Sequence, residues 1–93
     1  MAEATLKERL AEELRAALKA RQAVRLSTLR LLSAAVKNRE VELRREVSDQ
    51  EFLEVVAREA KRRREAIDAY ESAGRPDRAA TEREELAVLE AFL

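Results

Sequence analysis

The sequence contains no cysteine and no histidine, and only one glycine and one proline among its 93 residues. Without cysteine the chain has no disulfide framework, no thiolate nucleophile and no cysteine-based zinc site. Sheets and long loops depend on turn-forming residues, so the scarcity of glycine and proline predicts an all-α fold. A chain of this length provides one hydrophobic core but not two, and we expect a single domain over residues 1–93.

Long apolar runs are also missing, and none has the length of a signal peptide or a membrane span. We therefore expect a soluble cytoplasmic protein that does not enter a membrane. The 19 basic and 19 acidic side chains cancel, which excludes a strong overall field for nucleic acid or anionic lipid. Their distribution is uneven, because residues 1–47 carry 11 basic and 7 acidic side chains whereas residues 76–93 carry 2 and 5. Any binding of a polyanion must therefore be local.

Apolar periodicity predicts a first helix with leucine at every fourth position from Leu6 to Leu18. Thr5 and Glu8 have the spacing of a capping box at its start. A second helix, from about Ala23 to Arg45, is apolar on several sides in its first half. That pattern is typical of a central helix, and we expect this helix to be the most buried.

Ser48 and Glu51 repeat the capping-box spacing and mark the start of a third helix. Gly74 suits a left-handed helix end, and Pro76 suits the first turn of a fourth helix because its missing N–H has no partner there. The prediction is a small four-helix bundle of antiparallel helices joined by short turns. An extended coiled coil is disfavoured by these capped breaks.

Three arginines depart from the helical pattern. Projection at 100° per residue places Arg25 and Arg39 on the apolar line of the second helix, and Arg63 on that of the third. A buried guanidinium needs a carboxylate or carbonyl partner, so each either pairs with an acid such as Glu40 or Glu59 or lines a groove for an anion. Both interpretations stay open at the level of sequence.

The basic run from Lys61 to Arg64 resembles a nucleic-acid patch. On a helix, however, four consecutive residues spread around the circumference, and Lys61 with Glu65 and Arg64 with Asp68 have the spacing of surface ion pairs. The pattern favours a solvated, ion-paired surface. The candidate contacts for an anion, RNA or a partner are Arg25, Arg30, Lys37, Arg39, Arg62, Arg63 and Arg64.

Catalytic groups are scarce. Histidine and cysteine are absent, there is no glycine-rich loop to bind phosphate, and no carboxylate stands alone on an apolar face where its pKa would shift. The residues predict neither a catalytic site nor a metal site, and no cofactor is expected.

Four ordered segments carry a resemblance to a known family. They are RLSTLRLLSAAVKNREVE, SDQEFLEVV, KRRREAIDAYESAGRPD and the closing EREELAVLEAFL. Together they cover essentially the whole chain, which resembles the YqeY family. That family is similar to the C-terminal region of the GatB subunit of the tRNA-dependent amidotransferase. The resemblance implies a helical domain followed by a smaller helical tail that contacts tRNA, and we expect the tail domain to be absent here.

The resemblance also carries a label of carbon–nitrogen ligase activity with glutamine as amido-N-donor. In the amidotransferase, glutamine hydrolysis and ATP-dependent activation belong to parts that these residues do not resemble. The leading hypothesis is a non-catalytic accessory module that binds tRNA or an amidotransferase-like assembly. The alternative is a structural or protein-interaction domain with no RNA role.

The fourth helix ends in the apolar pair Phe92 and Leu93. A soluble domain seldom ends in an apolar pair unless something covers these side chains. The domain's own core, a second copy of the chain or a tail would do so. The resemblance favours the tail, with weak self-association through this end as its substitute.

Overall fold

The computed structural model describes residues 3–93 and confirms the all-α prediction. Four helices follow one another, α1 (Leu6–Lys19), α2 (Ala23–Leu43), α3 (Asp49–Ser72) and α4 (Pro76–Glu90), with no strand in the described residues. The molecule measures 49 × 31 × 20 Å along its principal axes. Within residues 3–93 no helix combines the length and the apolar character that crossing a membrane requires.

The capping box predicted at α3 forms in full, and the one predicted at α1 forms by half, through the Thr5 side chain. The Thr5 side chain accepts a hydrogen bond from the backbone N–H of Glu8 at 3.1 Å. At α3 the capping box is complete, because the Ser48 hydroxyl accepts from the N–H of Glu51 and the Glu51 carboxylate accepts from the N–H of Ser48. Pro76 lies in the first turn of α4. These local signals fix where two of the connections end.

The connections are short because each preceding helix ends in a left-handed residue. Gly74 has φ +70° and closes α3, with the N–H of Arg75 bonded to the carbonyl of Tyr70. Arg21 and Arg44 take the same conformation after α1 and α2, with φ 55° and 58°. These two arginines were not predicted to adopt it, since the conformation is costly for residues with a Cβ.

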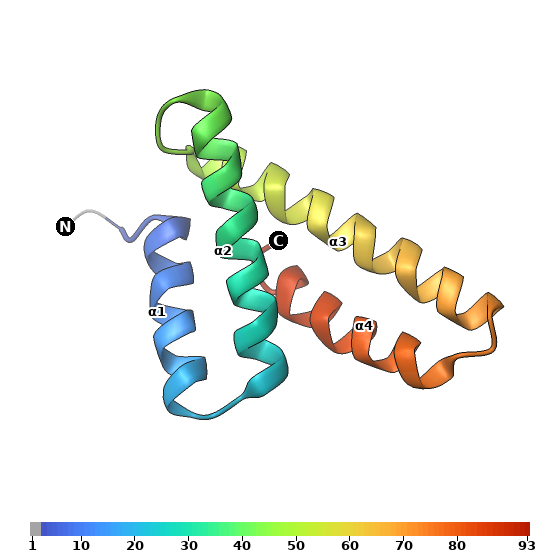
Figure 1. Ribbon diagram of the computed structural model, residues 1–93. Helices are drawn as coiled ribbons and strands as arrows, with labels where there is room; N and C mark the ends of the chain where they lie inside the picture. The colour runs from blue at the N-terminus through green and yellow to red at the C-terminus, as the bar shows by residue number, and fades with distance from the viewer. Residues whose placement is uncertain (1–2) are drawn as a thin grey trace.

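The helices form two antiparallel hairpins, α1 with α2 and α3 with α4 (Figure 1). The α3–α4 hairpin leans away from the first, so that the turn between α3 and α4 lies at the end of the molecule farthest from α1 (Figure 1). Both α2 and α3 contact every other helix. The bundle is therefore a pair of crossed hairpins.

The core lies where the hairpins cross. Its buried apolar residues are Leu10, Ala17, Leu29, Leu32, Val36, Phe52, Val55, Val56, Leu89 and Phe92. The expectation that the second helix is the most buried is wrong, since α3 has six buried residues and α2 has four. The physical reason is that Leu31 is 50% exposed and Val41 73% exposed. One apolar side of α2 therefore faces solvent, although the sequence pattern alone assigns that side to the core.

The apolar C-terminus is covered in part by the chain itself. Phe92 is only 4% exposed, and its ring centre lies 5.6 Å from that of Phe52. The domain's own core therefore covers Phe92, in place of the expected tail or second copy. Leu93 remains 59% exposed.

Candidate anion-binding groove between α2 and α3

A groove of about 170 Å³ lies between α2 and α3. Its lining is Ala35, Asn38, Arg39 and Glu42 from α2, and Val55, Arg58, Glu59 and Arg62 from α3. On each helix these positions follow the spacing i, i+3, i+4 and i+7, which places them on one face. Each helix thus presents one face with apolar and charged side chains to the same hollow.

Two of the three arginines in the groove are paired within their own helix. Arg39 Nη1 lies 3.0 Å from Glu42 Oε2, and Arg62 Nη1 lies 3.4 Å from Glu59 Oε2. A guanidinium has five N–H donors, so each ion pair leaves several of them available. Arg39 and Arg62 can therefore contact a further anion without losing their present partners.

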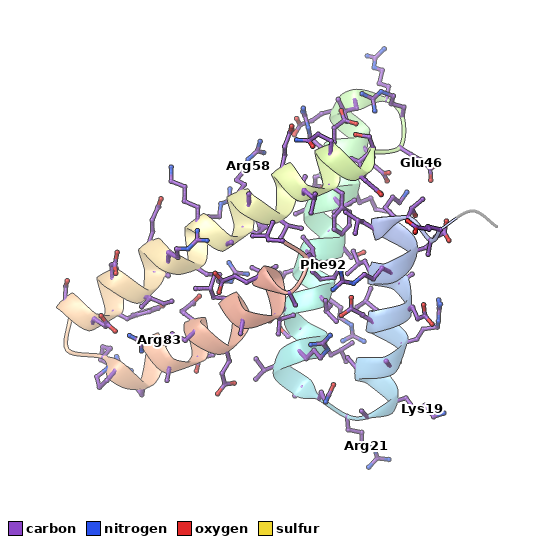
Figure 2. The ribbon with its side chains drawn as sticks, turned by 180° about the vertical axis from the view of Figure 1, so that it is seen from behind. Lys19, Arg21, Glu46, Arg58, Arg83 and Phe92 are labelled. Carbon is purple, nitrogen blue, oxygen red and sulfur yellow. The ribbon has the colours of Figure 1, made fainter. Side chains whose placement is uncertain are left out.

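Arg58 is the third arginine and the one that sequence reasoning missed. It projects from α3 into solvent (Figure 2), and no carboxylate oxygen within residues 3–93 lies within 4.0 Å of its guanidinium. It gives the groove one more positive than negative charge. The sequence does contain a signal for Arg58, because it lies four residues before Arg62 and therefore on the same helix face. The consecutive basic run from Lys61 to Arg64 obscured this spacing.

Arg63 lies apart from this groove, in the contact between α3 and α4. Its side chain is 14% exposed, whereas Lys61, Arg62 and Arg64 are all exposed. Arg63 Nε lies 2.9 Å from Glu85 Oε2 and 3.7 Å from Glu82 Oε2. The Nε–H of Arg63 has no hydrogen-bond acceptor in the described residues, so these contacts are ion pairs by distance alone. Arg63 is thus more buried than its three basic neighbours and lies against a carboxylate, as its place on the apolar line predicts.

The carboxylates around Arg63 repel one another. Burial, followed by the nearby charge of Glu85, raises the pKa of Glu82 above 4.5. One guanidinium faces two acids, so this cluster does not attract a further anion. The sequence predicts no carboxylate with a shifted pKa, and Glu82 shows that this expectation is wrong. The shift was not predictable because folding creates the burial of Glu82.

Arg25 belongs to a network of contacts that joins α1 to the C-terminal end of the chain. Its Nη2 donates to Glu13 Oε1, and Arg9 Nε donates to Glu13 Oε2 at 2.9 Å. Arg9 Nη2 also donates to the carbonyl of Ala91 at 2.9 Å. Arg25 and Arg39 keep about a third of their side chains exposed, so each lies at an edge and pairs with an acid. The acids are Glu13 and Glu42, where the sequence suggested Glu40 or Glu59.

The remaining candidates lie on the outside. Arg30 and Lys37 are exposed on α2, and within residues 3–93 neither has a carboxylate oxygen within 4.0 Å. Arg64 lies 3.8 Å from Glu90 on α4. The expected pairs of Lys61 with Glu65 and Arg64 with Asp68 do not form in the described residues. Arg64 is drawn to Glu90 of α4 instead, and no carboxylate oxygen in the described residues lies within 4.0 Å of the Lys61 amine.

The structure thus brings two of the seven candidates together, Arg39 and Arg62, and adds Arg58 to them. In the described part of the chain no three acidic side chains are placed to hold a metal ion. The arrangement is suited to electrostatic binding of a phosphate or carboxylate group, since arginine matches the geometry of both.

Comparison with known families gives a match to the family described as Yqey-like protein, over residues 7–93. No curated protein matches the sequence. The family match begins one residue after the start of α1 and runs through α2, α3 and α4 to the last residue. The chain therefore belongs to the YqeY family.

Proposed function

We propose that this chain is a non-catalytic helical accessory module of tRNA-dependent transamidation in the cytoplasm, and that the α2–α3 groove contacts the phosphate backbone of tRNA. The observation that carries the proposal is the unpaired guanidinium of Arg58 beside Arg39 and Arg62 in one open hollow. Membership of the YqeY family supports the link to transamidation, through the family's resemblance to GatB.

The charge of the groove sets the expected strength. Three arginines that each neutralise one phosphate give modest affinity with a marked dependence on salt. Raising salt from about 50 to 200 mM should then weaken binding roughly 20- to 40-fold. The proposed tail of the family would supply the remaining RNA contacts. A version extended through that tail is expected to bind tRNA more tightly than residues 1–93.

Filter binding of labelled tRNA at several salt concentrations tests the role of the groove. We expect Arg58→Gln and Arg62→Gln each to lower affinity and to reduce the salt slope by about one. Arg78→Gln is the matched control, because Arg78 is exposed on α4, has no ion pair in the described residues and lies outside the groove. An equal loss of tRNA affinity in all three variants would mean that the binding is nonspecific charge attraction and does not depend on the groove.

The alternative is a protein-interaction domain with no RNA role. It predicts no salt-dependent retention of tRNA by either the short or the extended chain. Tight binding by the short chain that equals the extended chain would place the whole RNA contact in these four helices and would exclude the proposed contribution of the tail.

A further inference from the structure

The first half of α2 presents an apolar surface that is partly open to solvent. Two hollows adjoin there at Ala23. One, of about 430 Å³, is lined by Ala23, Leu26, Ser27, Arg30 and Leu31. The other, of about 390 Å³, lies between the start of α2 and α4, where Val24 faces Val88 and Glu84. We call these two hollows together the α2 outer surface.

Two of the five large apolar side chains that are exposed in the described residues, Leu31 and Val24, line these hollows. Leu31 is 50% exposed and Val24 36% exposed, although Leu29 and Leu32 on the same helix are fully buried. Exposed apolar area beside small residues is typical of an interaction site. Ala23 and Ser27 lie one turn apart and are small enough to allow the axis of another helix to approach closely.

The charges at the edge identify the partner. Arg30 lines the larger hollow, and Lys37 follows two turns later on the same side of α2, and neither has a carboxylate partner in the described residues. Arg21 extends into solvent from the α1–α2 turn that precedes this surface (Figure 2). On the side of α2 that carries Arg30 and Lys37, a partner therefore gains from acidic side chains, with apolar side chains at its centre, whereas Glu84 lines the smaller hollow on the α4 side.

We infer that the α2 outer surface binds an acidic amphipathic helix of another protein. The hollows run along α2 from Gln22 to Leu31, which at 1.5 Å per residue is about 14 Å, or between two and three helical turns. Apolar residues at i, i+3 or i+4, and i+7 of the partner fill them. Acidic residues on its edge pair with Arg30 and Lys37.

A second copy of this chain fits the surface less well. Two α2 helices packed antiparallel about a twofold axis would place the edge that carries Arg30 and Lys37 beside the same edge of the copy. Like charges in contact oppose that association. This surface also shares no lining residue with the α2–α3 groove, so the inference does not rest on the RNA proposal.

Selection from a displayed library of helical peptides of about 18 residues, against the full chain, tests the inference. We expect the recovered peptides to combine leucine or isoleucine at helical spacing with glutamate or aspartate on one edge. One such peptide is then measured by fluorescence anisotropy. Leu31→Glu and Arg30→Glu should each weaken it at least tenfold, and replacement of its acids by lysine should abolish binding.

Leu93→Glu is the matched control, because Leu93 is similarly exposed but lies outside both hollows. It should leave peptide affinity unchanged, and Leu31→Glu should leave both the helical circular dichroism and tRNA retention unchanged. Recovery of no binders, or of basic peptides, overturns the inference. So does binding that survives Leu31→Glu, or a dimer in light scattering that Leu31→Glu disperses, since a second copy would then occupy the surface.

Discussion

The guanidinium carbon of Arg9 lies 4.4 Å from the centre of the Phe92 ring, so that a residue of the first helix covers the second-last residue of the chain. The same guanidinium donates to the carbonyl of Ala91, which α4 leaves without a helical partner. Phe92 lies at the centre of the molecule, between the two hairpins (Figure 2). The last turn is therefore part of the folded core.

Phe92→Ala should lower the free energy of unfolding by about 3 to 5 kcal/mol, because it removes a buried ring that packs on Phe52 and Arg9. Leu93→Ala should cost less than about 0.5 kcal/mol, since Leu93 is mostly exposed. Urea denaturation of both variants measures the difference. Similar small losses for the two would mean that Phe92 is not a core residue.

Leu32→Ala should cost about 2 to 5 kcal/mol, the usual range for a large-to-small change in a core. Leu32 is 1% exposed, whereas its neighbour Leu31 is 50% exposed, so Leu31→Ala should cost less than about 1 kcal/mol. The adjacent pair shares one helix and one side-chain type, so chemical denaturation isolates the effect of burial. A loss below about 1 kcal/mol at Leu32 would place it at the periphery.

The two acids beside Arg63 should respond differently to substitution. Glu85→Gln removes the carboxylate at 2.9 Å and should cost about 1 to 3 kcal/mol, because a mostly buried guanidinium loses its close partner. Glu82→Gln should cost less, since its carboxylate lies at 3.7 Å. Equal losses in thermal unfolding at neutral pH would contradict this order.

The pH dependence of Glu82 has a defined sign. Its pKa is raised in the fold, so its stabilising contribution is complete below about 4.5 and is lost as the pH rises through the folded pKa. Glu82→Gln does not titrate there, so the stability of this variant relative to the unsubstituted protein should improve as the pH rises from about 4.5 to 7. Denaturation at several pH values gives the difference curve, and a flat curve would refute the shift.

The start of α3 depends on a charged cap. The Arg45 guanidinium and then the Ser48 N–H lower the pKa of Glu51 to about 2. Its contribution is therefore present above about 4.5 and is lost as the pH falls through about 2. Ser48→Ala should cost about 0.5 to 2 kcal/mol at neutral pH. The Glu51→Gln variant should therefore be less stable than the unsubstituted protein at neutral pH but not in acid. A stability difference that stays constant down to pH 2 would contradict the lowered pKa of Glu51.

Local signals account for what could be predicted. The capping box of Ser48 with Glu51 and the left-handed Gly74 depend on neighbouring residues only, so sequence spacing was sufficient. Arg63 was recognised because one charge interrupts an apolar line. Its partners Glu82 and Glu85 were not, because they come from a helix whose register against α3 is set by packing.

Periodicity was misleading where an apolar side of a helix has no intrachain partner. Leu31 and Leu32 have the same hydrophobicity, yet only the tertiary arrangement of the hairpins decides that one is exposed. The same applies to the groove, because Arg58 and Arg39 belong to helices whose relative placement no local pattern specifies.

The outward lean of the α3–α4 hairpin has a dynamic consequence. Its outer end, around Gly74, lies away from α1 and α2 (Figure 1), and Ile67 and Ala79 are the buried apolar residues nearest to it. Few buried apolar residues hold the outer ends of these two helices together, so this end should fray by local unfolding while the crossing of the hairpins stays intact. Amide protons near Tyr70 should exchange with deuterium well before those near Leu29, and proteases should first cleave at this outer end.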